Sequence, residues 1–112
     1  MTRLSTITYT RYGHASIPTA LTTAAGFKHR EFLACGLVEG TAIFQPVDHA
    51  HILELSAELV ILTSMRTDDS ISVPREALDY LGIARAGDSL TATVRRGEII
   101  LQVAPQEEKR TA

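Results

Sequence analysis

The chain has no tryptophan, a single cysteine and no long apolar run. Aromatic residues make up only 5% of its 112 residues, so a core must be built mainly from aliphatic side chains. Cys35 cannot form a disulfide within the chain, and we expect it to be a small buried residue in a protein of the reducing cytoplasm. No apolar stretch approaches the ~20 residues of a membrane span, and residues 1–6 lack the apolar segment of a signal peptide.

An excess of positive charge is also missing. The chain carries 11 Lys and Arg against 13 Asp and Glu, a formal net charge of −2. Domains that bind nucleic acid usually have a basic surface, because phosphate contacts supply much of their affinity. The overall charge therefore gives no support for nucleic-acid binding, and such an activity would depend on basic residues gathered on one face.

Motifs of catalysis are absent as well. The sequence has no Gly-rich phosphate loop and no Ser/His/Asp or Cys/His pattern of known spacing. His49 and His51 could lie on one side of a strand as half of a metal site, but no further ligands are identifiable, and solvent-exposed histidines are the simpler interpretation. We therefore expect no enzymatic activity, no cofactor and no metal.

What the chain does contain is an internal repeat. Residues 70–83, Ser-Ile-Ser-Val-Pro-Arg-Glu-Ala-Leu-Asp-Tyr-Leu-Gly-Ile, have a weaker counterpart 56 residues earlier, at residues 14–27. In both copies a Ser-aliphatic-Pro step is followed eight residues later by glycine and a large apolar residue. A repeat of this kind indicates that the whole architecture is built from two related halves.

Each half predicts the same succession of elements: a strand, a loop, a short extended piece, a two-turn helix that ends at a glycine, and a hairpin. The apolar run at residues 59–62 favours a strand buried on both faces. The predicted strands and extended pieces are 4–11, 15–17, 32–38, 41–45, 58–66, 71–73, 89–94 and 99–103, and the predicted helices are 19–25 and 74–81.

The predicted fold class is mainly β with short helices. We expect a first, divergent repeat over residues 1–47, a connection over 48–56, a second repeat over 57–104 and a flexible tail over 105–112. A repeat of about 50 residues buries little core by itself. The two repeats should therefore form one unit, in which the hairpin of one half pairs with strands of the other.

Residues 71–90, Ile-Ser-Val-Pro-Arg-Glu-Ala-Leu-Asp-Tyr-Leu-Gly-Ile-Ala-Arg-Ala-Gly-Asp-Ser-Leu, resemble the swapped-hairpin family of AbrB, MazE and SpoVT domains. The likeness extends over 63–103 and, more weakly, over 7–47, where Glu31-Phe32 replaces the Gly-Asp strand start. In that family two copies exchange hairpins to form a small barrel. The resemblance implies a swapped-hairpin AbrB-like barrel formed here from two tandem repeats.

The family resemblance also implies function: a transcription regulator that contacts duplex DNA through basic residues on the first strands and in the loops before the helices. Such regulators often assemble further, so we also expect homo-oligomers. Carried over by position, the candidate DNA-binding residues are Arg3, Arg11, His14, Arg66 and Arg75.

Two alternatives stay open. The chain could be a MazE-like antitoxin with a toxin partner, although the nine residues after the last predicted strand are short for a tail that wraps a toxin. It could instead be a protein-interaction barrel that has lost DNA binding, because Asp68 and Asp69 would repel phosphate and could pair with Arg66. The basic cluster at residues 28–30 could be a second phosphate-contacting patch or a solvated loop.

Overall fold

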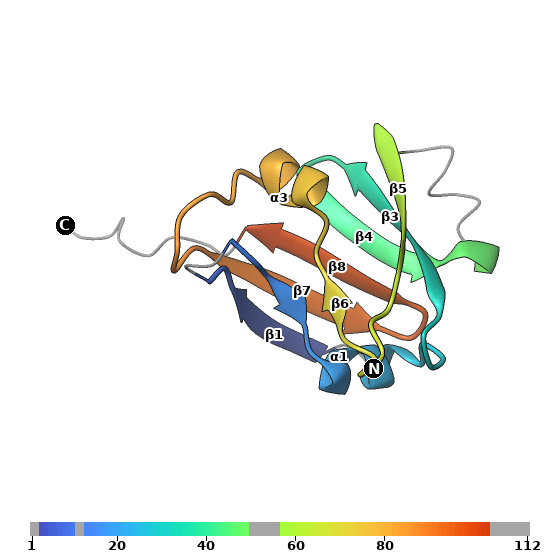
Figure 1. The fold of residues 1–112 in the computed structure, drawn as a ribbon. Helices are drawn as coiled ribbons and strands as arrows, with labels where there is room; N and C mark the ends of the chain where they lie inside the picture. The colour runs from blue at the N-terminus through green and yellow to red at the C-terminus, as the bar shows by residue number, and fades with distance from the viewer. Residues whose placement is uncertain (1–2, 11–12, 50–56, 104–112) are drawn as a thin grey trace.

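The structure is a computed structural model that describes residues 3–10, 13–49 and 57–103 (Figure 1). It is mainly β, as the sequence predicts. The elements in chain order are β1 (Arg3–Thr8), β2 (Ser16–Ile17), α1 (Thr19–Ala25), β3 (Phe32–Val38), β4 (Thr41–Pro46), the 3-10 helix η1 (Val47–His49), β5 (Leu59–Ser64), β6 (Ile71–Ser72), α3 (Arg75–Leu81), β7 (Ser89–Arg95) and β8 (Glu98–Val103).

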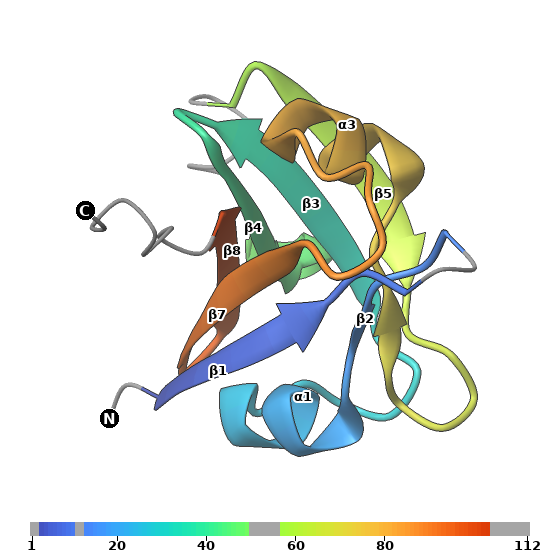
Figure 2. The same cartoon turned by 90° about the vertical axis from the view of Figure 1, so that its left-hand side faces the viewer.

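Six strands form one antiparallel sheet in the order β1-β7-β8-β4-β3-β5. The first strand of each half pairs with the hairpin of the other half: β1 lies beside β7, and β5 lies beside β3 (Figure 2). The two hairpins meet through β4 and β8. A second, two-stranded sheet joins β2 to β6. Neither half could therefore build its share of the sheet alone.

The two halves are related by an approximate twofold axis. Exchanging each strand for its counterpart in the other half turns the strand order of the large sheet into its own reverse. Equivalent residues of the two halves face each other where the axis passes: Ile43 opposite Ile100 in the large sheet, and Ser16 opposite Ser72 in the small one. The repeat in the sequence is thus a symmetry of the fold.

Both helices are delimited by residues that act locally. Pro18 and Pro74 precede the first helical residue with extended backbone, and Gly26 and Gly82 follow the last one with φ of 81° and 77°. Proline has a fixed φ that suits a helix start, and glycine adopts positive φ without a steric cost. These four residues explain why both helices have the length that the sequence predicts.

The loop before the hairpin differs in sequence between the two repeats, but in both repeats a carboxylate accepts hydrogen bonds from its backbone. The Asp88 carboxylate accepts hydrogen bonds from the backbone N–H of Ala84 (3.1 Å) and Arg85 (2.9 Å), which lowers its pKa. Glu31 occupies the corresponding place in the first half, and its carboxylate accepts from the N–H of Lys28 (2.8 Å). A carboxylate thus holds the loop before the hairpin in both repeats, although the first repeat lacks the Gly-Asp sequence.

The core lies between the large sheet and a layer formed by the β2–β6 ribbon and the two helices. Burial raises the pKa of the Cys35 thiol to about 12, which keeps it neutral and unreactive. The largest fully buried side chains are Phe44, Ile17, Leu21, Leu33, Ile71, Leu78, Leu90, Ile99, Leu101 and Val94, together with Thr22 and Cys35.

Three expectations need correction. β5 is not buried on both faces: it lies at the edge of the sheet, where Leu59 is 49% and Leu62 is 70% exposed. The first strand ends at Thr8, so the predicted strand is too long by residues 9 and 10, and its last residue, Arg11, lies outside the described residues. Within the described ranges no sheet closes on itself, because β1 and β5 remain at opposite edges of the large sheet.

Candidate nucleic-acid interface

The β2–β6 ribbon lies across the core side of the large sheet, on the twofold axis of the fold. Ile17 and Ile71 are opposite each other and fully buried, whereas Ser16 and Ser72 are opposite each other and exposed. This is the alternation expected of a strand with one buried side. The ribbon therefore presents paired serine hydroxyls to solvent at the centre of one face.

Two equivalent loops flank the ribbon. In one, the N–H of Thr10 donates to the carbonyl of His14 (2.8 Å), and in the other the N–H of Arg66 donates to the carbonyl of Ser70 (2.8 Å). The residue at the tight point of each turn has positive φ: Gly13 at 83° and Asp69 at 66°. We call the surface made by residues 13–16, 66–70, 72 and 75 the ribbon face.

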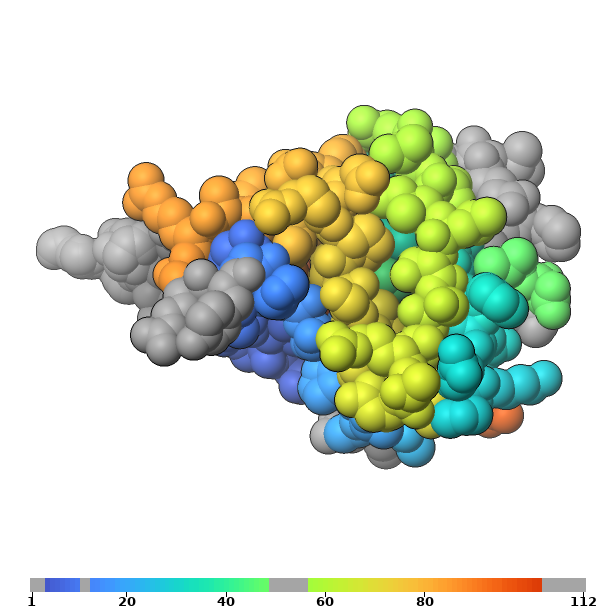
Figure 3. Space-filling model, in the orientation of Figure 1, coloured from blue at the N-terminus to red at the C-terminus, as the bar shows by residue number. Residues whose placement is uncertain are grey.

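The structure brings together some of the predicted DNA-binding residues. His14 and Arg75 are exposed and line one hollow of about 350 Å³ between the first loop and β5. The Arg75 guanidinium reaches Gly13, where a β-carbon would lie 3.9 Å from its Nη2. Arg66 is exposed in the second loop. The yellow segment that contains this loop follows β5 on the face seen in Figure 3. The backbone of Arg3 belongs to β1, but its side chain and all of Arg11 lie outside the described residues.

The acidic pair in the second loop makes local hydrogen bonds. Asp68 accepts from the hydroxyl (2.6 Å) and the N–H (3.0 Å) of Ser70, and these bonds hold the pKa of its carboxyl below the usual value. Asp69 approaches the His29 imidazole, with 2.8 Å between Oδ1 and Nδ1, and also accepts from the N–H of Arg30 (3.0 Å). Asp69 is thus directed toward residues 28–30 of the other half, and its side-chain partner is His29, where the sequence suggested Arg66.

Two threonines of α1 also hold this loop, and sequence reasoning missed them. The Thr19 hydroxyl donates to the carbonyl of Asp68 (2.7 Å), and the Thr22 hydroxyl donates to the carbonyl of Asp69 (2.7 Å). Thr22 is the only buried polar residue in the described part of the chain. Its counterpart in the second half is Leu78, so a threonine at an otherwise apolar core position was the available signal.

We expect the contact between Asp69 and His29 to make the free energy of unfolding depend on pH. The hydrogen bond from His29 lowers the pKa of the Asp69 carboxyl, so its contribution to stability is present above the unfolded-state pKa of about 4. That contribution is lost as the pH falls through the lower folded-state pKa. We expect Asp69→Asn to lower the free energy of unfolding at pH 7 and to have a smaller effect at a pH well below about 4, measured by urea unfolding.

The matched control for this experiment is Asp79→Asn, which changes an exposed aspartate of α3. It should not reproduce the loss at pH 7. An equal cost of Asp69→Asn at both pH values would contradict an ionic contribution and would leave only the neutral hydrogen bonds.

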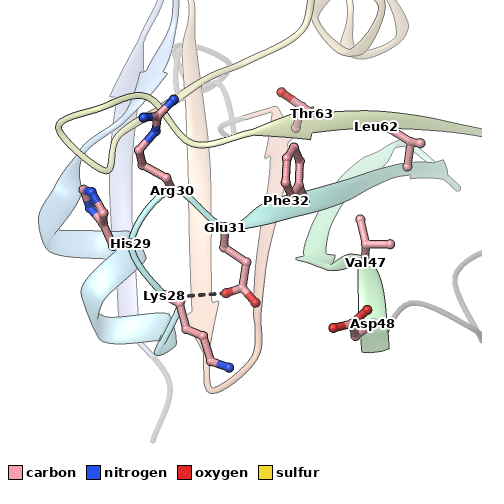
Figure 4. A pocket seen from close by; sticks show the side chains of 9 residues that line it. All are labelled: Lys28, His29, Arg30, Glu31, Phe32, Val47, Asp48, Leu62 and Thr63. Carbon is pink, nitrogen blue, oxygen red and sulfur yellow. Dashed lines mark hydrogen bonds between the residues drawn. The ribbon is translucent and has the colours of Figure 1, made fainter.

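A second hollow, of about 480 Å³, lies on the other side of β5 (Figure 4). Its walls combine the basic cluster with exposed apolar side chains: Phe32 is 73% exposed, and Leu62 projects from the edge strand beside it. The remaining lining residues are Lys28, His29, Arg30, Glu31, Val47, Asp48 and Thr63.

Comparison with known proteins identifies no relative: no family model, no curated protein and no solved structure matches the chain. Among the described residues no group of three or more His, Cys, Asp or Glu side chains could hold a metal ion. In the same part of the chain no helix is long and apolar enough to cross a membrane. The chemistry of the ribbon face must therefore be argued from its own residues.

Proposed function

We propose that this chain is a DNA-binding transcription regulator of the AbrB/SpoVT type, in which two tandem repeats form one swapped-hairpin unit and contact duplex DNA with the ribbon face. The pairing of β1 with β7 and of β5 with β3 supports this proposal, because it is the exchange of elements between copies that the resemblance implies. The unit differs from a closed barrel, because in the described ranges two edges of the sheet have no strand partner.

The observation that carries the proposal is the symmetry of the ribbon face. The approximate twofold axis passes between Ser16 and Ser72, with an equivalent loop on either side. Duplex DNA has twofold axes of its own, and symmetric readers use them to contact both strands in the same way. A face with this symmetry can place one loop against each strand of the duplex.

The charges of the face suit phosphate contact in spite of the net charge of the chain. Arg66 and Arg75 are exposed, and guanidinium groups form bidentate bonds with phosphate oxygens. Ser16 and Ser72 can donate hydroxyl hydrogen bonds between them. Asp69 is turned toward His29, which leaves Asp68 as the exposed acidic side chain of the loop. We therefore expect moderate affinity that depends strongly on salt.

Fluorescence anisotropy with AT-rich and mixed duplexes at several salt concentrations tests the proposal. We expect Arg66→Ala and Arg75→Ala each to weaken binding and to reduce the slope of log affinity against log salt by about one, since each removes one phosphate contact. Arg96→Ala is the matched control, because Arg96 is exposed at the tip of the β7–β8 hairpin, outside the ribbon face.

Two results would overturn this assignment. If the folded wild-type chain shows no binding at low salt, the protein is an interaction module and the DNA proposal fails. If the wild-type chain binds DNA but Arg96→Ala weakens binding as much as Arg66→Ala and Arg75→Ala do, the interface lies elsewhere on the molecule.

A further inference from the structure

The edge strand β5 lacks the features that usually prevent a sheet edge from pairing with another strand. Its sequence, Leu-Val-Ile-Leu-Thr-Ser, contains no charged residue, proline or glycine. It pairs only with β3, and within the described residues no other backbone hydrogen bond reaches Leu59–Ser64. In an antiparallel strand, every second residue turns its N–H and C=O away from the paired neighbour. Sheet edges that stay single are usually protected by charge, proline or a bulge.

The outer face of the sheet, opposite the core, is apolar at positions of β5 and β3 whose counterparts at the β1–β7 edge are polar. Leu62 of β5 stands where β1 has Thr6, and Phe32 of β3 stands where β7 has Ser89. On β1 itself the exposed apolar side chain is Leu4.

Ala34 also corresponds to a threonine, Thr91, but it is buried and packs against Val47 and Val60. Phe32 and Leu62 are 73% and 70% exposed. Because the two halves share one backbone plan and the counterparts of these two residues are polar, their apolar side chains are not required by the fold. An apolar patch that the fold does not need indicates an interaction surface.

In the part of the chain that the structure describes, a hollow lies on each side of this edge. Leu62 and Thr63 line one hollow together with His14 and Arg75 and another together with Phe32 (Figure 4). The two ends of the edge carry opposite charges: Glu58 precedes β5 and Arg66 follows it, and both are exposed. The edge is therefore complementary to an antiparallel copy of itself.

We propose that β5 pairs antiparallel with β5 of a second copy of the chain, with Leu62 opposite Leu62, to form a symmetric dimer with one continuous sheet. In this register the acidic end of each strand meets the basic end of the other. The interface is isologous, which is the commonest arrangement in homodimers. This strand pairing covers the exposed leucine side chains and also gives the unpaired backbone groups of β5 hydrogen-bond partners.

The proposed dimer does not depend on the proposed function. Its consequence for DNA contact does rest on that function. The twofold axis of an antiparallel strand pair is perpendicular to the sheet. It therefore leaves both ribbon faces on the same side of the joined sheet, where they can contact two half-sites of one duplex.

Sedimentation velocity of the full chain over a range of concentrations, without DNA, tests the dimer independently of the proposed function. We expect wild type to dimerise, and Leu62→Lys to raise the dissociation constant at least about tenfold, because like charges would stand opposite each other. Thr6→Lys is the matched control, since Thr6 is the exposed residue that corresponds to Leu62 on the other edge.

Leu62→Cys supplies a second test that does not depend on loss of a signal. Residues directly opposite in an antiparallel pair have Cα atoms about 4.5–5.5 Å apart, within the range of a disulfide. Mild oxidation should crosslink Leu62→Cys into a dimer and leave Thr6→Cys largely monomeric, and native Cys35 is buried. The proposal is overturned if wild type stays monomeric at its highest soluble concentration, or if Thr6→Cys crosslinks as well as Leu62→Cys.

Discussion

Separating the two halves of the chain is expected to abolish the folding of each half as a monomer. Among the described residues, β1 pairs only with β7 of the other half, and β5 pairs only with β3. The hairpin tips also cross over: Gly97 donates to the carbonyl of Ala25 (2.8 Å), and Gly40 donates to the Tyr80 hydroxyl (3.1 Å). A separate half of about 50 residues would lose these partners and most of its buried surface.

The measurement is circular dichroism and thermal unfolding of fragments 1–56 and 57–112, alone and mixed. We expect little cooperative unfolding from either dilute fragment and a restored transition on mixing, with a Tm that rises with concentration because folding has become bimolecular. A protease site introduced between residues 50 and 56 of the intact chain provides the control, since the sample can be compared before and after cleavage. A fragment that unfolds cooperatively at any dilution would contradict the mutual dependence of the halves.

Ile71→Ala is expected to lower the free energy of unfolding by about 2–5 kcal/mol, the usual cost of truncating a fully buried isoleucine. Ile71 is completely buried and stands opposite Ile17 in the ribbon, where it fills the space between the ribbon and the large sheet. The cavity would form beside the twofold axis, beneath the ribbon face. DNA affinity should fall too if the ribbon positions both loops.

Urea unfolding followed by circular dichroism measures this effect. The neighbouring Ser72→Ala is the matched control, because Ser72 is in the same strand but exposed, and substitutions at exposed sites usually change stability by less than about 0.5 kcal/mol. The double variant Ile17→Ala/Ile71→Ala should be non-additive, since the two residues face each other. If Ile71→Ala lowered the free energy of unfolding by less than Ser72→Ala, the packing of the ribbon against the core would not contribute to stability.

Elements whose limits are set by neighbouring residues could be predicted from the amino-acid sequence. The helices Thr19–Ala25 and Arg75–Leu81 and the strand Phe32–Val38 end at glycine or at a tight turn, and the first two begin after proline. These residues act through their own φ preferences, so no distant contact is needed to place them. The repeat likewise showed that two related halves exist, although their interlocking follows only from the strand pairing.

The tertiary structure alone decided which strands lie at the edges and which side chains meet. An apolar run such as Leu59–Leu62 has the same local preference in the centre of a sheet as at its edge, and only the pairing with β3 reveals that its other side is open. The pair of His29 with Asp69 joins residues 40 positions apart, and His14 and Arg75, which are 61 positions apart, line the same hollow. Such contacts depend on how the halves interlock, which no short stretch of sequence encodes, because local preference fixes each segment but not its neighbours in space.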